Sequence, residues 1–151
     1  MQRAALSGAD VLIQELEDFT APALRPQARA LAPELYAAWR ASGAVVAVRV
    51  NPLELDGMDD LAAVMRGRPD IVALPKVAGP HHVARLDAEV SRLEREYGTP
   101  EGFTALLPNI ELAGALVQAG AIAAASRRTV GCLLASEDLA ADLGAERSRD
   151  G

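Results

Sequence analysis

Aromatic side chains and cysteine are scarce in this sequence. Only 3% of its 151 residues are aromatic, and 21 acidic residues against 15 basic ones give a net charge of −6. A chain with no basic stripe and few rings for base stacking is not expected to bind nucleic acid. The single cysteine, Cys132, lies in an apolar run, which predicts a small buried side chain in a reducing compartment rather than a disulfide or a nucleophile.

Long hydrophobic runs are missing as well. No segment approaches the roughly 18 apolar residues of a membrane span, and the N-terminal segment MQRAALSGADV lacks the apolar stretch of a secretory signal. We therefore expect a cytoplasmic protein with no membrane partner. Half of the residues are apolar, which is enough to build one domain with a sizeable core.

Five apolar runs recur at the spacing of a strand, a helix and short loops. They are VLIQELED (11–18), AVVAVRVN (44–51), DIVALPKV (70–77), FTALLPNIE (103–111) and TVGCLLASED (129–138). Parallel strands of an α/β protein present their C-terminal ends on one face, so the charged residues at these ends should gather around a single mouth. These residues are Glu15, Glu17, Asp18, Arg49, Lys76, Glu111 and Asp138.

Segments of helical period follow the first four runs, at 21–41, 56–67, 80–98 and 112–125. Within the first of these segments, Pro26 and Pro33 predict a start near Arg25 and a kink or restart at Pro33. The segment 112–125 is almost uncharged, which predicts a helix buried on more than one side.

The wording and order of the strand ends resemble the citrate lyase β-subunit, or HpcH/HpaI aldolase, family. The matching blocks are GADVLIQELED, AVRVN, ALPKV, LLPNIE and ASEDLAADLG, in order and without large gaps from about residue 3 to residue 149. The resemblance implies a (β/α)8 TIM-barrel type of fold, which needs ~250 residues. Because only about five βα units are present, we expect residues 1–151 to form a partial, incomplete α/β barrel domain with open edges.

The resemblance also implies a chemistry. Enzymes of this family make or break a carbon–carbon bond beside a carbonyl, usually in an acyl-CoA such as citryl-CoA or malyl-CoA, and Mg2+ holds the oxo acid. Glu111 and Asp138 match the metal-binding positions, and Arg49 matches the catalytic arginine. Two carboxylates suit Mg2+, or Mn2+ in its place, because such ions bind one or two protein oxygens and fill the remaining positions with water and substrate.

Other strand-end residues have weaker assignments. By resemblance, Glu17 and Asp18 lie near the water shell of the metal, although strand alternation sends Glu15 and Glu17 to one face and Asp18 to the other. Lys76 could contact a substrate phosphate or carboxylate, or equally hold a neighbouring acid. The resemblance further implies a homo-oligomer, specifically a trimer.

Structural explanations compete with these functional ones. Glu111 could cap the helix that follows it, and Asp138 could belong to an acidic first turn capped at Ser136. Arg49, which would be costly as an unpaired buried charge, could form an ion pair with Glu17 or Asp18.

Two functions therefore remain open for the chain. The first is a Mg2+-dependent carbon–carbon lyase acting on an acyl-CoA or related oxo acid, which the joint presence of Arg49, Glu111 and Asp138 favours. The second is a truncated, non-catalytic family member that acts as a subunit or interaction partner. Departures from the family pattern at Phe19 and Leu112, beside the expected pocket, favour this alternative.

Overall fold

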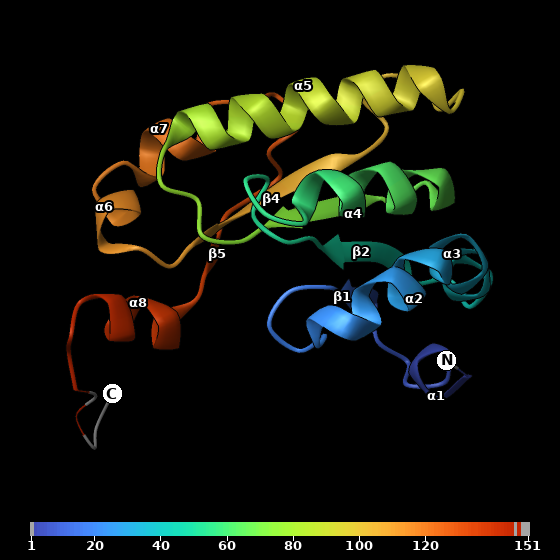
Figure 1. The fold of residues 1–151 in the computed structure, drawn as a ribbon, viewed down its shortest axis with the longest axis horizontal. Coiled ribbons are helices and arrows are strands. Elements are labelled where there is room, and N and C mark those ends of the chain that lie inside the picture. The colour runs from blue at the N-terminus through green and yellow to red at the C-terminus, as the bar shows by residue number, and fades with distance from the viewer. Residues whose placement is uncertain (1, 147, 149–151) are drawn as a thin grey trace.

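Five parallel strands in chain order form the sheet of this protein (Figure 1). The structure is a computed structural model that describes residues 2–146 and 148. The strands are β1 (Val11–Glu15), β2 (Val45–Arg49), β3 (Ile71–Leu74), β4 (Ala105–Ile110) and β5 (Leu133–Leu134). All four neighbouring pairs are parallel, so the C-terminal ends of the strands share one edge, as the βα spacing predicts.

Helices connect the strands at the predicted places. They are α1 (Gln2–Ala5), α2 (Arg25–Ala30), α3 (Ala32–Ala41), α4 (Gly57–Val64), α5 (Pro80–Glu96), α6 (Ala113–Leu116), α7 (Ala119–Ala123) and α8 (Ser136–Asp142), with 3-10 turns η1 (Pro22–Leu24) and η2 (Met65–Gly67). The predicted start near Arg25 and restart at Pro33 are confirmed, because α2 ends at Ala30 and Pro33 stands in the first turn of α3. A proline is tolerated there because the amide it lacks has no partner in the helix.

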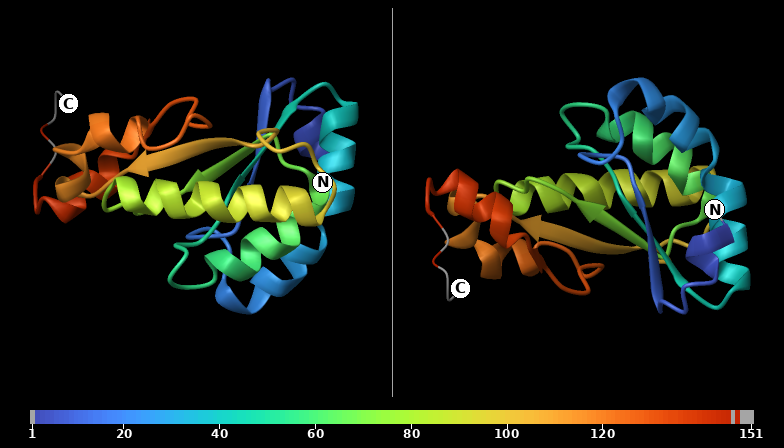
Figure 2. Two further views of the ribbon diagram at one scale, coloured as in Figure 1. Left: turned by 90° about the horizontal axis from the view of Figure 1, so that it is seen from above. Right: turned by 90° about the horizontal axis from the view of Figure 1, so that it is seen from below.

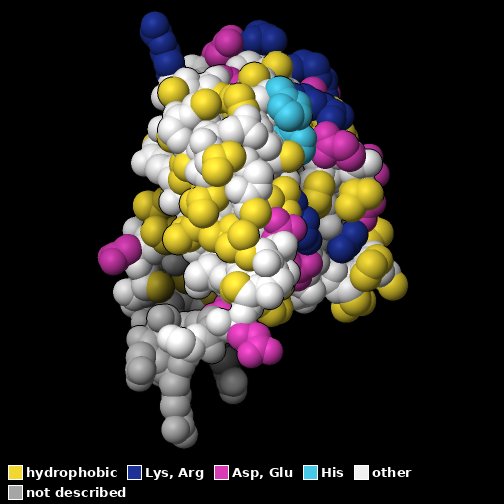
Figure 3. Space-filling model, turned by 90° about the vertical axis from the view of Figure 1, so that its left-hand side faces the viewer, with side chains coloured by type: hydrophobic (Ala, Val, Ile, Leu, Met, Phe, Trp, Pro, Cys, Tyr) yellow, Lys and Arg dark blue, Asp and Glu magenta, His cyan; other side chains and the backbone are white. Residues whose placement is uncertain are grey.

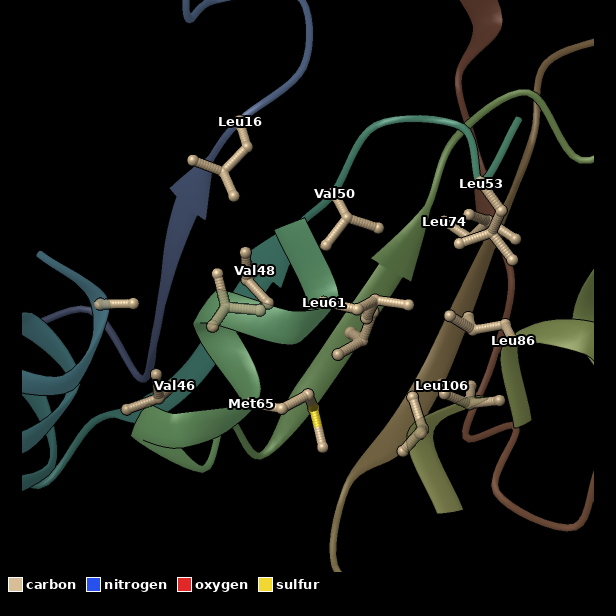
Figure 4. Close-up of a cluster of buried hydrophobic side chains, with 14 of the residues drawn as sticks. Leu16, Val46, Val48, Val50, Leu53, Leu61, Met65, Leu74, Leu86 and Leu106 are labelled. Carbon is tan, nitrogen blue, oxygen red and sulfur yellow. The ribbon is translucent and has the colours of Figure 1, made fainter. Parts of the chain in front are cut away.

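The hydrophobic core lies between one face of the sheet and helices α2–α5. Strand alternation places Val46, Val48 and Val50 on this face, and all three are fully buried. Figure 4 shows them facing Leu61 and Met65 of the α4–η2 segment. Further buried members of the cluster include Leu16, Leu53, Leu74, Leu86 and Leu106.

The opposite face of the sheet is largely open. On β1 and β2 this face carries Val11 and Ile13, each 49% exposed, and Val45, which is 40% exposed. Figure 2 shows the large helices following only one side of the curved sheet. An open inner face and a β1 edge paired only with β2 are what an incomplete barrel leaves.

The prediction of one well-buried helix over 112–125 is wrong. The segment forms two short helices, α6 and α7, and Val117 between them is 86% exposed. Ala115 and Ile122 are buried, and α7 packs against α5 and β4. Leu112 and Ala125 are only partly buried against the core, and Leu116 is 45% exposed. Figure 3 shows apolar side chains gathered at the end of the molecule where α6 and α7 lie.

The fifth strand is also much shorter than the run 129–138. Only Leu133 and Leu134 pair with β4, and Thr129 forms an isolated bridge to Leu106. Cys132 is exposed, so its predicted burial is wrong. The physical reason is its place beside β5, which has β4 as its only partner strand in the described sheet. No helix in the described part of the chain is long and apolar enough to cross a membrane.

Candidate active site

Charged side chains from the ends of β1, β2, β3 and β4 contact one another at the C-terminal edge of the sheet. In the register of the parallel pair, Arg49 at the end of β2 lies opposite Glu15 at the end of β1. Its Nε lies 2.6 Å from Glu15 Oε2 and 3.6 Å from Glu17 Oε2. The ion pair with Glu17 that competed with a functional role is thus present, and Glu15 is a nearer partner that was not expected. Burial alone would lower the pKa of Arg49, but the hydrogen bond to Glu15 and the charges of Glu17 and Asp18 raise it.

Lys76 connects the end of β3 to the acidic end of β1. Its Nζ donates a hydrogen bond to Glu17 Oε1 and lies 3.5 Å from Asp18 Oδ1. The hydrogen bond to Glu17 is the largest cause that raises the pKa of Lys76, which burial opposes. Of the two roles open to Lys76 from the sequence, holding neighbouring acids is the one that its contacts match.

Glu111 follows β4 and is almost completely buried, with 3% of the residue exposed. Its Oε1 accepts a hydrogen bond from the main-chain N–H of Lys76. The capping explanation is therefore not met, since Leu112 is the N-cap of α6 and the first N–H of that helix, from Ala113, donates to Asp142 Oδ2 rather than to Glu111. Burial raises the pKa of Glu111, the Lys76 N–H opposes this, and the charges of Glu17 and Asp138 raise it further.

Asp138 lies in the exposed first turn of α8 together with Glu137. The N-cap of α8 is Ala135 rather than Ser136, and no side chain caps the helix. Acidic residues in a first turn interact favourably with the helix dipole, so this structural explanation agrees with the geometry. Asp138 also acts on Glu111, because its charge helps to raise the pKa of that carboxyl.

The donor set at this edge fits a hard divalent cation. The charge of Asp138 acts unfavourably on the ionised form of the buried Glu111 carboxylate. A cation would relieve this repulsion, and Mg2+ binds through one or two carboxylates with water and substrate as its other ligands. Within the described residues no group of three or more histidine, cysteine, aspartate or glutamate residues is arranged to hold a metal.

Sequence reasoning missed two features of this edge. Glu15 is the close partner of Arg49. Both residues end runs that the sequence shows, but their contact depends on the register of β1 and β2, in which they are paired. Asn109 is 1% exposed, and its Oδ1 has no hydrogen-bond partner among the residues that the structure describes. Strand alternation puts Asn109 on the same face of β4 as Glu111, so a buried amide with an unpaired oxygen lies two residues before that carboxylate. An amide in an apolar strand was its only signal.

Comparison with known proteins identifies the lineage of this site. Citrate lyase subunit beta of Escherichia coli K12 is 38% identical over 149 residues, covering 95% of this chain and 48% of the relative. L-malyl-CoA/beta-methylmalyl-CoA lyase of Cereibacter sphaeroides is 32% identical, covering 95% of this chain and 46% of the relative. The chain therefore spans about half the length of these relatives.

The fold agrees with this lineage. A malate synthase of Haloferax volcanii, crystallised as a pyruvate/acetyl-CoA ternary complex, superposes with a TM-score of 0.83 at 21% identity, over 97% of this chain and 45% of that one. The expected incomplete TIM-type barrel is thereby confirmed, with five parallel strands forming a half-barrel. The sequence profile of one family, HpcH/HpaI aldolase/citrate lyase, matches residues 1–151. The chain belongs to the HpcH/HpaI aldolase/citrate lyase family.

Proposed function

We propose that this protein contributes the active-site half of a carbon–carbon lyase acting on an acyl-CoA, of the citryl-CoA or malyl-CoA type, or on a related oxo acid. The observation that carries the proposal is the contact between Lys76 and Glu111 beside the Arg49–Glu15 pair, at the C-terminal edge where barrel enzymes hold their active sites. The relatives named as citrate lyase and malyl-CoA lyase support this reaction class.

Arg49 has the chemistry to bind the anionic end of an oxo acid. Its contact with Glu15 is made through Nε, and neither terminal guanidinium nitrogen donates a hydrogen bond to another described residue. These two nitrogens form the planar fork that binds a carboxylate or an enolate with two parallel hydrogen bonds. Glu15 holds the guanidinium in place, so that the fork is preorganised for the negative charge that develops when the carbon–carbon bond breaks.

Glu111 and Asp138 would hold Mg2+, or Mn2+ in its place. When bound, such an ion supplies Lewis-acid polarisation of the oxo group. Glu17 and Asp18 would interact with the water around it, while Lys76 neutralises part of the acidic cluster through its contacts with both. A homo-oligomer, and a trimer in particular, remains part of the proposal.

A non-catalytic role is the second candidate, and the open inner face of the sheet favours it. Val11 and Ile13 are each 49% exposed on that face, and an exposed apolar surface of this kind is typical of a contact with another chain. In that case the strand-end charges would serve only as structural ion pairs.

Substitution of Arg49 separates the two candidates. Arg49→Lys keeps the positive charge but removes the fork, so cleavage of malyl-CoA or citryl-CoA should fall by about 10²–10³, while calorimetric Mg2+ affinity changes little. Arg85→Lys is the matched control, because Arg85 is exposed and its ion pair with Glu54 involves none of the strand-end residues of the candidate site. These rates are compared in a protein that contains the complete barrel, because this chain spans about half the length of its relatives. Cleavage at the unmodified rate by Arg49→Lys in that protein would contradict the lyase proposal.

A further inference from the structure

Lys76 has an unusual backbone conformation. Its φ is +51°, in the left-handed region, which is unfavourable for a residue with a Cβ. One other described non-glycine residue, Arg68 at φ +56°, shares this region. Arg68 is the C-cap of η2, a common place for left-handed residues. Lys76 follows a strand and caps no helix, so its conformation needs another explanation.

The contacts of Lys76 supply one. Its main-chain N–H donates to Glu111 Oε1, while its side chain reaches Glu17 and Asp18 beyond β1. A single residue thus joins the ends of β1, β3 and β4. Because Glu111 is buried and accepts no other hydrogen bond from a described residue, the direction of this one N–H fixes the carboxylate.

We propose that Lys76 is a positioning residue whose left-handed backbone, rather than its positive charge, holds the Glu111 carboxylate ready for a divalent cation. The inference rests on the proposed metal site at Glu111 and Asp138 and adds the element that orients it. Hydrogen bonds to a ligating carboxylate fix its orientation, and losing such a partner typically weakens metal binding by about 10–100-fold.

A series of four substitutions isolates the backbone from the charge. Lys76→Gly, Lys76→Asn, Lys76→Ala and Lys76→Val all remove the ammonium group, so they share one electrostatic change. Glycine adopts the left-handed region without cost and asparagine tolerates it, whereas alanine and especially valine do not. Calorimetric titration of the 151-residue chain with Mg2+ should give similar affinities for Gly and Asn, and affinities about tenfold weaker for Ala and Val.

Thermal unfolding of each variant accompanies the titration. If Lys76→Val does not fold, the comparison of Ala with Asn decides, because Asn is the larger side chain but tolerates the left-handed region. Equal Mg2+ affinity across the folded variants would overturn the inference, as would an order that follows side-chain size. Glu111→Gln and Asp138→Asn distinguish failure of the positioning role of Lys76 from failure of the metal site itself. If these variants lose Mg2+ binding while the Lys76 series is flat, only the positioning role fails. If they bind Mg2+ like the unmodified chain, the metal site and the positioning role fail together.

Discussion

Removal of the Glu94 carboxylate should strongly destabilise the fold. Glu94 lies on α5 with its side chain fully buried, and it accepts four hydrogen bonds. Two come from the main chain, from the N–H of Gly102 and of Thr104, each at 2.8 Å. Two come from Arg128, at 3.0 Å from Nη1 and 2.7 Å from Nη2. The carboxylate therefore ties α5 to the chain segments that lead into β4 and β5.

The size of the effect follows from these contacts. Glu94→Ala leaves two main-chain donors without partners, at about 1–3 kcal/mol each. It also removes one half of a buried ion pair, and breaking such a pair typically costs about 3–5 kcal/mol. Arg128 keeps Asp87 at 2.7 Å, which places the loss in free energy of unfolding at about 3–5 kcal/mol rather than higher. For a chain of this length that is a fall in Tm of roughly 6–20 °C.

Circular dichroism during thermal unfolding measures this loss. Glu101→Ala is the control, because Glu101 forms an exposed ion pair with Arg95, and such pairs contribute little. If Glu94→Ala unfolds at the same temperature as Glu101→Ala, the four hydrogen bonds do not carry the stability assigned to them.

Three further outcomes are expected. Burial alone would raise the pKa of Glu94, but Arg128 and the two N–H groups hold it below the ordinary value of 4.5. The stabilising contribution of Glu94 is therefore present above pH 4.5 and is lost as the pH falls through the lower folded pKa. Glu94→Gln should make the free energy of unfolding depend less on pH in that range, and an unchanged pH dependence would contradict this role of Glu94. The open inner face should make the chain self-associate or be only marginally stable. Sedimentation velocity at several concentrations should show association, and Ile13→Thr should reduce it. A stable monomer at every concentration would contradict this expectation. Val11→Thr, on the same open face, should also reduce self-association. Increased association of this variant would contradict the prediction that this face makes the contact between chains.

The strands and most helices could be predicted from the sequence because their signals are local. Apolar runs with charged ends mark β1 to β4, and their order along the chain became their order in the sheet. The prediction failed where burial depends on distant elements. Residues 112–125 and Cys132 are apolar and predicted to be covered, but sequence alone does not say whether a neighbouring element covers them.

The candidate site shows the same division. The gathering of charged strand ends could be predicted because parallel strands place their C-terminal ends at one edge. The family resemblance assigned metal binding to Glu111 and Asp138 and catalysis to Arg49, and these roles stay predictions. The contact between Glu15 and Arg49 needed the strand register, which the apolar pattern does not specify to one residue. The left-handed backbone of Lys76 could not be predicted, since lysine has no preference for that region and only the hydrogen bond to Glu111 accounts for it.

The central claim is that Glu111 and Asp138 form a site for Mg2+, and calorimetric titration tests it most directly. We predict that the unmodified chain binds Mg2+ and that Glu111→Gln and Asp138→Asn each weaken binding, because each removes one of the two carboxylates available to a hard cation. Manganese should compete for the same site. Unchanged Mg2+ affinity in both variants, or no binding by the unmodified chain, would contradict the account.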